Sequence, residues 1–400
     1  MKELHEDDHR AQANQLDLYH IEEEAPGMIF WHPRGYQIYR ELEDYIRLKM
    51  RRLGYQEVKT PQLLPRSLWE RSGHWDKFGE QMFVVPRENE RDLALKPMSC
   101  PCHLQIFKDR RRSWRELPLR YAEFGACHRD EPSGAMHGLM RTRAFEQDDA
   151  HVICLPDQIA DEVERFIGLV REVYAALGFE DFEVALSLRP DVRAGSDEDW
   201  DWSEAELMRA ARAAGVEPKL LPGEGAFYGP KLEFSLKDRQ GRSWQCGTAQ
   251  LDQVLPKRLG ASYVSSEGDK KIPLMIHHAV LGSLGRAIGI LIEECSAQLP
   301  LWLAPEQVAL MPISDAHMDY AREVEDGLLS RDIRAKVFLP SETLSRRIVS
   351  ARELKIPVFA VLGDREKASR SCALRIGKNQ ETLPIFEFYD RVDTLCARPQ

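Results

Sequence analysis

The residues from Phe124 to His151 combine the side-chain types that a nucleoside triphosphate site requires. This stretch, FGACHRDEPSGAMHGLMRTRAFEQDDAH, has the pattern of two strands joined by a turn. Arg129 offers a planar fork for a phosphate or a carboxylate, Glu131 can accept from an exocyclic amine, and Phe145 presents a flat face to a base. A strand pair with a purely structural role rarely turns so many charged groups inward. The stretch therefore predicts a nucleotide site.

Phosphate binding in this chain has to rely on side chains. The sequence contains neither GxxxxGK[ST] nor a GxGxxG between a strand and a helix, the glycine loops that usually cradle phosphates. A second phosphate-binding candidate is Arg286 in HHAVLGSLGRAIGIL, where a strand is expected to pass through a Gly-Ser turn into a helix. Taken alone, Arg286 is more simply explained as a surface arginine on a helix.

Three residues could form a metal site with three protein ligands and open positions for a substrate. They are Cys100 in KPMSCPCH, His151 in QDDAHV and His277 in PLMIHHAV. Their separations are too long for spacing to decide, and Cys100, Cys102 and His103 suggest a local cluster equally well. A lone histidine on an apolar strand is more often a satisfied core residue. Asp149 shares the strand face of His151, where it could orient a ligand or accept from a bound hydroxyl.

Length and composition are those of an ordinary globular protein. Four hundred residues suggest two or three domains, and a hydrophobic content of 43% is sufficient for packed cores. The start, MKELHEDDHR, lacks the apolar segment of a signal peptide, and no run of about eighteen apolar residues follows. The eight cysteines without paired spacing indicate reduced thiols. Together these features predict a cytoplasmic protein that makes no membrane contact.

Charge is distributed unevenly along the chain. The net charge of −10 argues against bulk coating of nucleic acid but permits a local basic face. Residues 108–120 carry six basic and two acidic side chains, and residues 331–378 carry twelve basic and five acidic side chains. A solvated surface explains each segment equally well, whereas a nucleotide site in the same chain favours a polyanionic partner.

The chain divides into two regions of different pattern and has no internal repeat. From about residue 8 to 300, strand-like runs predict an antiparallel sheet rather than βαβ units, with helices over 35–53 and 155–177. These runs are PLRYAEFGACHR, RTRAFEQDDAHVIC, PKLEFSLKD and RSWQCGTAQLD. LPLWLAPEQ then has the prolines of a linker. Beyond it, VALMPIS, AKVFLP and PVFAVLGD alternate with helices, the pattern of a small parallel α/β domain.

Five motifs resemble, in order, the catalytic core of threonyl-tRNA synthetase, a class II aminoacyl-tRNA synthetase. They are KPM-S-C, FGxCHRxEPSG…GLMRxRxFxQDDAH, GEGAFYGPK, QCGTxQLD and MIH…LGSxxR. The resemblance covers nearly the whole chain and implies an α+β fold. A class II synthetase antiparallel sheet flanked by helices would occupy residues 1–303, and a small α/β anticodon-binding domain residues 304–400. Pro61 in EVKTP matches the first motif of the class, which implies a homodimer.

The resemblance also implies one zinc ion per subunit, held by Cys100, His151 and His277, that binds threonine through its amino group and its hydroxyl. Valine has the same shape without the hydroxyl, so such a site rejects valine where an apolar pocket could not. Asp149 would accept the hydrogen bond of the threonine hydroxyl. The other residues that the resemblance places around threonine are Met98, Gln147, Tyr228, Gln245 and Gln250.

For activation of the amino acid, the resemblance implies ATP with Mg²⁺ and a set of charged and aromatic contacts. Arg129 would bridge the α-phosphate and the threonine carboxylate, and Glu131 would read the adenine amine. Phe145 would stack on adenine opposite Arg286, and Arg141 and Arg286 would hold the distal phosphates. A carboxylate is already a nucleophile, so in-line placement and charge neutralisation suffice for this step.

Two further residues have expected roles in the same site. Lys231 in the YGPK turn would add positive charge near the carboxylate and the phosphate. The terminal adenosine of tRNA would then attack the threonyl adenylate, and His74 in RSGHWDKF matches the family histidine that assists this transfer. Packing of His74 beside Trp75 is the structural alternative.

In the second region, Glu366 and Arg375 match family positions that contact anticodon bases, and a carboxylate with a guanidinium suits the edges of single-stranded bases. Where the family usually has IGxKIR, this chain has LSRRIV at 344–349, so one basic contact is lost. Arg346 and Arg347 are expected to compensate through phosphates.

Other departures from the family pattern remove no group with an assigned role, and together they indicate a diverged copy. They are Pro101-Cys102-His103 in place of PGH, His278 in place of an arginine, Ala144 in place of a glycine, and Gly285 before the arginine of the third motif. The chain begins at the catalytic core, without the N-terminal domains that hydrolyse mischarged seryl-tRNA in most bacterial members. We therefore expect a ligase without in-cis editing that activates serine measurably.

Three functions remain open. The first is formation of threonyl adenylate and transfer to threonine tRNA, which His74, Glu366, Arg375 and a whole second domain favour. The second is a paralogue that makes threonyl adenylate for a carrier-protein thiol or a biosynthetic amine, which the lost IGxKIR-like segment favours. The third, a non-catalytic regulatory or RNA-binding relative, conflicts with retention of the metal ligands and the phosphate-binding arginines.

Overall fold

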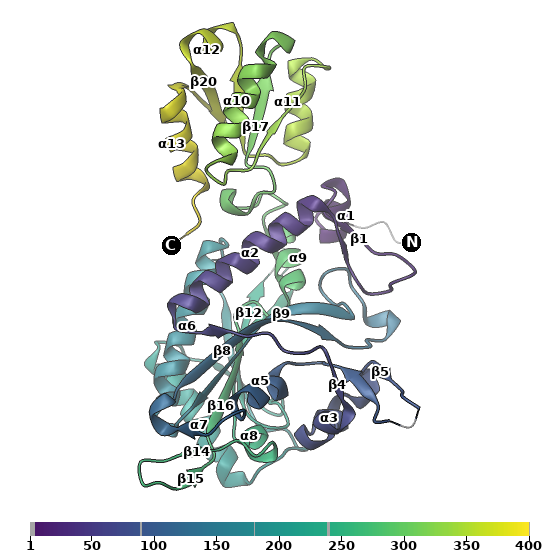
Figure 1. Ribbon diagram of the computed structural model, residues 1–400, viewed down its shortest axis with the longest axis vertical. Helices are drawn as coiled ribbons and strands as arrows, with labels where there is room; N and C mark the ends of the chain where they lie inside the picture. Colours follow the sequence, from purple (N-terminus) through teal and green to yellow (C-terminus); the bar gives the residue numbers. More distant parts are fainter. Residues whose placement is uncertain (1–4, 89, 180, 238–240, 400) are drawn as a thin grey trace. The chain divides into compact units, whose positions relative to one another are not determined.

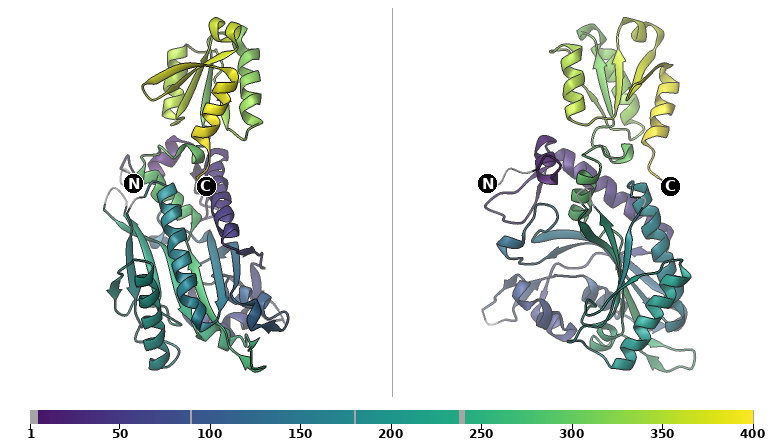
Figure 2. Two further views of the ribbon diagram at one scale, coloured as in Figure 1. Left: turned by 90° about the vertical axis from the view of Figure 1, so that its left-hand side faces the viewer. Right: turned by 180° about the vertical axis from the view of Figure 1, so that it is seen from behind.

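The structure, a computed structural model, describes residues 5–88, 90–179, 181–237 and 241–399. These residues form two compact units (Figures 1 and 2). Residues 21–29 and 43–290 make up the sheet unit, and residues 5–20, 30–42 and 291–399 make up the terminal unit. Helix α2 (Pro33–Arg52) and helix α9 (Leu284–Glu294) each contain residues of both units.

An eight-stranded sheet forms the centre of the sheet unit. Its strand order is β11-β10-β12-β13-β16-β9-β8-β3. The strands are β3 (Gln56–Glu57), β8 (Leu119–His128), β9 (Ala144–Cys154), β10 (Glu183–Ser187), β11 (Lys219–Leu221), β12 (Lys231–Lys237), β13 (Ser243–Asp252) and β16 (Leu274–Ala279). From β10 to β8 every neighbouring pair is antiparallel, and only the outer strands β11 and β3 pair in parallel. The predicted antiparallel sheet is therefore confirmed.

The two faces of this sheet are covered by different helices, because successive side chains of a strand point to opposite faces. On one face, Phe166 of α6 (Ile159–Ala176) packs against Phe234 with ring centroids 5.6 Å apart and against His278. On the other face, Leu104 and Phe107 of α5 (Cys100–Phe107) join an apolar cluster with strand residues. His277, next to His278 in β16, therefore faces the α5 side.

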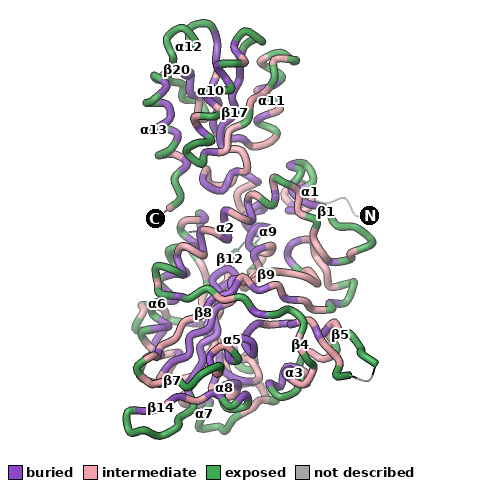
Figure 3. Tube along the Cα trace, viewed as in Figure 1, coloured by how far each residue is buried: buried purple, intermediate pink, exposed green. Residues whose placement is uncertain are grey.

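Smaller elements complete the sheet unit. A three-stranded sheet contains β4 (Leu63–Pro65), β6 (Leu93–Leu95) and β5 (Val84–Val85), and a second contains β15 (Lys270–Lys271), β14 (Tyr263–Val264) and β7 (Arg112–Ser113). The remaining helices are α3 (Arg66–Ser72), α4 (His74–Phe78), α7 (Asp197–Ala213) and α8 (Val254–Arg258). Figure 3 shows that the central strands are largely buried, and every residue of β16 is buried.

The terminal unit contains a five-stranded sheet of order β18-β17-β19-β20-β21. Its strands are β17 (Val308–Pro312), β18 (Ala335–Val337), β19 (Val358–Leu362), β20 (Ser371–Ile376) and β21 (Asn379–Pro384). The expected parallel arrangement holds for β18, β17 and β19, whereas β20 and β21 add an antiparallel edge that the sequence pattern did not predict. The unit also contains α10 (Met318–Leu329), α11 (Leu344–Glu353), α12 (Asp364–Ser369), α13 (Ile385–Cys396), α1 (His9–Gln15), β1 (Tyr19–His20) and β2 (Phe30–Trp31).

Two expectations about the whole chain concern thiols and membranes. All eight cysteines are free, as their spacing indicated. Within the described residues, none of the helices has the length and apolar character needed to cross a membrane.

Candidate active site

A cleft of about 570 Å³ opens on the sheet unit, a size that suits a small-molecule ligand. All five residues predicted to bind ATP line it: Arg129, Glu131, Arg141, Phe145 and Arg286. Five of the six predicted threonine-binding residues also line it, namely Met98, Gln147, Asp149, Gln245 and Gln250, together with the metal candidate His277. The fold thus brings together residues that lie up to about 190 positions apart in sequence.

Arg129 follows the end of β8 and lies between two aromatic rings. The guanidinium carbon is 5.2 Å from the ring centre of Phe145 and 5.5 Å from that of Phe78. The Nε and Nη2 groups donate to the carbonyl of Pro97 at 3.3 Å, which is long for a hydrogen bond of a charged donor. These rings hold the guanidinium in the cleft, and its long contacts leave it available for an anion.

Glu131 and Arg141 pair with each other in this structure. Arg141 Nη2 lies 2.9 Å from Glu131 Oε2, and Arg141 keeps about half of its side chain exposed (51%). The expected roles, with Glu131 on the adenine amine and Arg141 on the distal phosphates, therefore require this pair to open or to share its oxygens with the nucleotide.

Arg286 lies inside the cleft and is not a surface arginine of α9. Its Nε donates to the carbonyl of Met140 at 2.9 Å, and its Nη1 to the carbonyl of Gln245 at 3.4 Å. Burial lowers the pKa of the Arg286 guanidinium below its usual value, although the group remains charged at neutral pH. The side chain is thus fixed at two backbone points with its charge directed toward the cleft.

The turn that precedes α9 is held by Asp148, a residue that the sequence analysis did not single out. Its carboxylate accepts from the backbone N–H groups of Val280 at 2.8 Å and Leu281 at 3.0 Å. Burial raises the pKa of Asp148 to about 7, while these hydrogen bonds oppose the shift. On β9, Asp148 lies next to Asp149 and points to the opposite face, so the two carboxylates serve different parts of the site.

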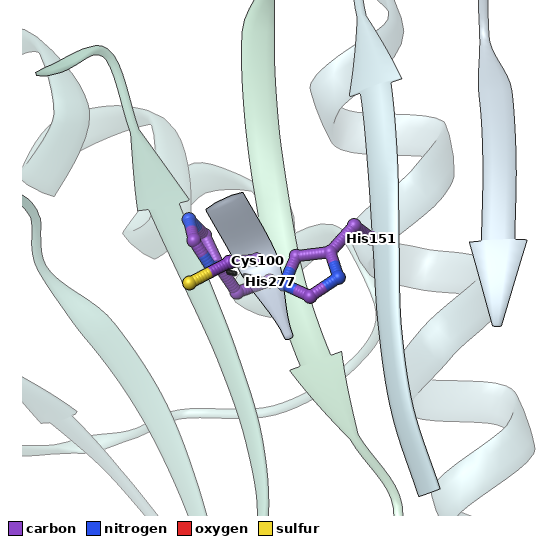
Figure 4. A group of neighbouring side chains, drawn as sticks. All are labelled: Cys100, His151 and His277. Atoms are coloured by element: carbon purple, nitrogen blue, oxygen red, sulfur yellow. Dashed lines mark hydrogen bonds between the residues drawn. The ribbon is translucent and has the colours of Figure 1, made fainter. Parts of the chain in front are cut away.

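Cys100, His151 and His277 converge from three separate elements (Figure 4). Cys100 is the first residue of α5, His151 lies in β9, and His277 lies in β16, directly opposite His151 in the strand register. Their ligand atoms lie within 4.8 Å of one another, and all three side chains are buried. Burial lowers the pKa of His151 well below 6.5, so its imidazole is neutral.

The donor atoms of this group fit a divalent cation. His277 Nε2 lies 2.8 Å from Asp252 Oδ2. The other oxygen of this carboxylate, Oδ1, accepts from the backbone N–H of Val254 at the start of α8. Since a carboxylate accepts, Nε2 of His277 carries the hydrogen, and in that tautomer the Nδ1 lone pair faces His151 Nε2 at 3.2 Å. One sulfur and two imidazole nitrogens with room beside them are typical of zinc ligation.

The alternative cluster of Cys100, Cys102 and His103 does not form. Cys102 packs in an apolar cluster with Trp69, Met82 and Ala94. His103 instead contacts His151, with their Nδ1 atoms 2.8 Å apart.

Three predicted residues do not line the cleft but contact residues near it: His74, Tyr228 and Lys231. His74 is fully buried, its Nε2 is 3.3 Å from Cys100 Sγ, and burial lowers its pKa to about 3. The ring of Tyr228 stacks on His277 at 5.1 Å. Lys231 pairs with Glu233 at 2.6 Å.

Comparison with known proteins agrees with this geometry. The family model for the class II tRNA synthetase core domain (G, H, P, S and T) matches residues 83–295, and the anticodon binding domain model matches residues 307–395. The structure superimposes, with a TM-score of 0.95 and 36% identity, on a solved "RNA binding domain of Threonyl-tRNA synthetase" from Cryptosporidium parvum, covering 98% of this chain and 99% of that one. The chain belongs to the threonyl-tRNA synthetase family.

Bacterial members of the family are more similar in sequence. The chain is 53% identical over 374 residues to a threonine–tRNA ligase of Dichelobacter nodosus and 54% identical over 389 residues to one of Caulobacter vibrioides. These matches cover 94% and 97% of this chain but only 58% and 59% of the two ligases.

The residues expected to read the anticodon lie in the terminal unit of this synthetase family member. Glu366 Oε2 accepts from the backbone N–H of Gly363 at 2.9 Å, which caps α12. Arg375 on β20 is half-buried, and its Nε donates to the carbonyl of Gly377 at 3.4 Å. The anticodon contacts of Glu366 and Arg375 remain predictions.

The expectation for Arg347 is wrong. Its guanidinium is buried and donates to three backbone carbonyls, those of Pro312 at 2.7 Å, Phe338 at 3.0 Å and Glu342 at 3.1 Å. A phosphate cannot reach it without breaking these bonds. Arg346, on the exposed side of α11, stays available for a phosphate.

We predict that Arg347→Ala destabilises the terminal unit by about 2 to 4 kcal/mol, because three backbone carbonyls lose a buried, charged donor. Thermal denaturation followed by circular dichroism would show a lower Tm. Arg346→Ala is the matched control and should change stability by less than about 0.5 kcal/mol. Equal Tm values for the two variants would contradict the structural role of Arg347.

The basic run at 108–120 is only partly exposed. Arg112 donates to the carbonyl of Phe107 at 2.9 Å, and Arg120 pairs with Glu162 at 2.6 Å. Arg110, Arg111 and Arg115 are exposed. A polyanion could therefore contact about half of the basic side chains in this run.

Proposed function

We propose that the chain is a threonine–tRNA ligase, which activates L-threonine with ATP and transfers it to threonine tRNA. The observation that carries this proposal is the single cleft that gathers all five candidate ATP residues beside the Cys100, His151 and His277 group. The domain boundary is proposed near residue 303, which falls between the two segments that match the family models.

Cys100, His151 and His277 would hold one zinc ion per subunit, and their sulfur and nitrogen donors support this assignment. When bound, the zinc would supply open positions for the amino group and the hydroxyl of threonine. Asp149 would accept the hydrogen bond of that hydroxyl, and its Oδ1, 3.7 Å from His151 Nε2, supports this role. Tyr228 stacks on His277 and donates to Gln250 Oε1 at 2.5 Å, so it orients both the ligand and the pocket wall.

ATP enters with Mg²⁺ as the second substrate. Arg129 binds the α-phosphate and the threonine carboxylate together, which brings nucleophile and phosphorus into contact and neutralises charge in the transition state. Arg286 and Arg141 bind the distal phosphates, and Phe145 stacks on adenine while Glu131 accepts from its amine. Lys231 would add positive charge near the carboxylate and the phosphate once it turns away from Glu233, with which it pairs at 2.6 Å.

The acceptor is proposed to be tRNA bound by a homodimer. The match to an anticodon binding domain at residues 307–395 supports tRNA as the partner. Pro61 supports the dimer through its place in the first class motif. His74 would assist the transfer step, and its contact with Cys100 Sγ at 3.3 Å supports a role near the metal group.

Two assays in sequence test the proposal. ATP–pyrophosphate exchange that depends on threonine would establish activation, and attachment of labelled threonine to purified threonine tRNA would establish transfer. Absence of threonine-dependent exchange would contradict the activation step. Exchange without attachment would contradict tRNA as the acceptor.

A further inference from the structure

A buried ion pair lies next to the candidate metal group. Lys96 and Glu123 are 1% and 3% exposed, and Lys96 Nζ lies 3.1 Å from Glu123 Oε1. Thr60 completes the pair, because its backbone N–H donates to Glu123 Oε1 at 2.7 Å and its hydroxyl to Oε2 at 2.8 Å. Lys96 Nζ in turn donates to the Thr60 hydroxyl at 2.9 Å. A buried lysine and glutamate satisfied to this degree are seldom incidental.

Glu123 is held in its ionised form. Burial alone would raise its pKa, but the hydrogen bonds from His103 and Thr60 and the charge of Lys96 lower the pKa to about 2. An ionised carboxylate has no hydrogen to donate, so every polar contact of Glu123 must be a hydrogen bond that it accepts.

This requirement fixes the proton positions on two histidines. His103 Nε2 lies 3.2 Å from Glu123 Oε2, so Nε2 carries the hydrogen, and in that tautomer of the imidazole Nδ1 is a lone pair. His103 Nδ1 lies 2.8 Å from His151 Nδ1, so His151 donates from Nδ1. The lone pair of His151 is then on Nε2, the atom that faces His277.

The proton position of His277, the second imidazole of the group, is also set by a carboxylate, which contacts this ring directly. Asp252 accepts from His277 Nε2 at 2.8 Å, which leaves the His277 Nδ1 lone pair 3.2 Å from His151 Nε2. Two lone pairs at this separation repel each other unless a cation lies close to both. The proton arrangement therefore prepares both imidazoles as metal ligands before any ion arrives.

We propose that Lys96, Thr60, Glu123 and His103 form a hydrogen-bonded chain that positions His151 and sets its tautomer for metal binding. His103 and Glu123 are positioning residues that act through His151, and Lys96 with Thr60 keeps Glu123 ionised and in place. Lys96 and His103 flank Cys100 in sequence. The hydrogen-bonded chain therefore also attaches the segment with the sulfur ligand to strands β8 and β9. The inference rests on the proposed metal site and adds residues to it.

Glu123→Gln tests the proton arrangement directly. The glutamine carbonyl replaces Oε1 toward Thr60 and Lys96, which turns its NH₂ toward His103 Nε2. His103 would then carry its hydrogen on Nδ1, and His151 would carry its hydrogen on Nε2, where a metal must bind. We expect zinc affinity, measured by competition with a chromogenic chelator, to fall about 10- to 100-fold.

A pair of variants at His103 separates orientation from packing. His103→Asn keeps an acceptor oxygen near the position of Nδ1, whereas His103→Leu fills similar space without an acceptor. We expect His103→Asn to retain at least about tenfold higher zinc affinity than His103→Leu. With cobalt(II) in place of zinc, the Leu variant should keep the thiolate charge-transfer band from Cys100 but change the visible ligand-field bands.

Glu162→Gln is the matched control, because Glu162 is a buried carboxylate of the same unit that pairs with Arg120 and touches no metal candidate. It should leave zinc affinity within about twofold of the parent chain, with folding of all variants checked by circular dichroism. If the folded Glu123→Gln and His103→Leu variants showed the zinc affinity and cobalt spectra of the parent, the proposed hydrogen-bonded chain would be overturned, but the metal site would not. A parent protein that binds no zinc would overturn the metal site and this inference together, whatever its activity.

Discussion

Replacing Arg129 by alanine is expected to lower kcat/KM for threonine-dependent ATP–pyrophosphate exchange about 1,000-fold. The guanidinium lies over Phe145 in the cleft and would bind two negatively charged reactants at once. Loss of one preorganised donor in such a site costs about 3 to 4 kcal/mol of transition-state stabilisation. Arg129→Lys should recover little of this loss, because an ammonium cannot form the planar two-point contact.

Arg111→Ala provides the control for Arg129. Arg111 is an exposed arginine of the same unit and lies outside the cleft lining. Its replacement should leave exchange unchanged within about twofold. An Arg129→Ala variant that keeps more than about one tenth of the parent kcat/KM would contradict its assignment to the α-phosphate and the carboxylate.

Threonine should be activated about 10,000-fold more efficiently than valine. The two side chains have the same shape, but valine would offer no hydroxyl to Asp149, whose side chain is only 14% exposed and so has little access to water as a substitute donor. Unpaired buried polar groups are the reason that such sites reject an analogue without the hydroxyl far more strongly than an apolar pocket does. Exchange assays with each amino acid, compared as kcat/KM, measure the ratio. A threonine-to-valine ratio below about 100 would indicate recognition by shape alone.

Serine is the informative third substrate in the same assay. It keeps the hydroxyl and lacks one methyl group, which is worth about 1 to 3 kcal/mol, or about 10- to 200-fold. We therefore expect exchange with serine to be measurable. No detectable exchange with serine beside strong exchange with threonine would mean that the pocket packs around the methyl group more tightly than the donor chemistry requires.

The sequence pattern predicted those parts of the fold whose side chains alternate regularly. Strands β8, β9, β12 and β13 lie within the runs that alternation indicated, and helices α2 and α6 lie within their predicted ranges to within a few residues. The edge strands β20 and β21 were not predicted, because β21 (NQETLP) is mostly polar and exposed and shows no apolar alternation. Gly377, with φ of 58°, marks the hairpin turn between them and was the available signal.

The site could be predicted only through motifs, because its ligands are far apart in sequence. Cys100, His151 and His277 are placed next to each other by the register of β9 against β16 and by the start of α5, which spacing alone does not reveal. The sequence did not indicate which charged residues are buried and hydrogen-bonded inside the protein. Arg347 has the sequence context of a surface arginine, and nothing in the residues beside Glu123 and Lys96 indicates that these two form a pair, yet all three are buried.

Zinc analysis of the purified chain, by inductively coupled plasma mass spectrometry beside a Cys100→Ser variant, tests the central claim most directly. The account predicts one zinc per parent chain, little zinc in the variant, and loss of threonine-dependent exchange in parallel with the loss of metal. A parent chain that contains no zinc and still activates threonine would contradict it.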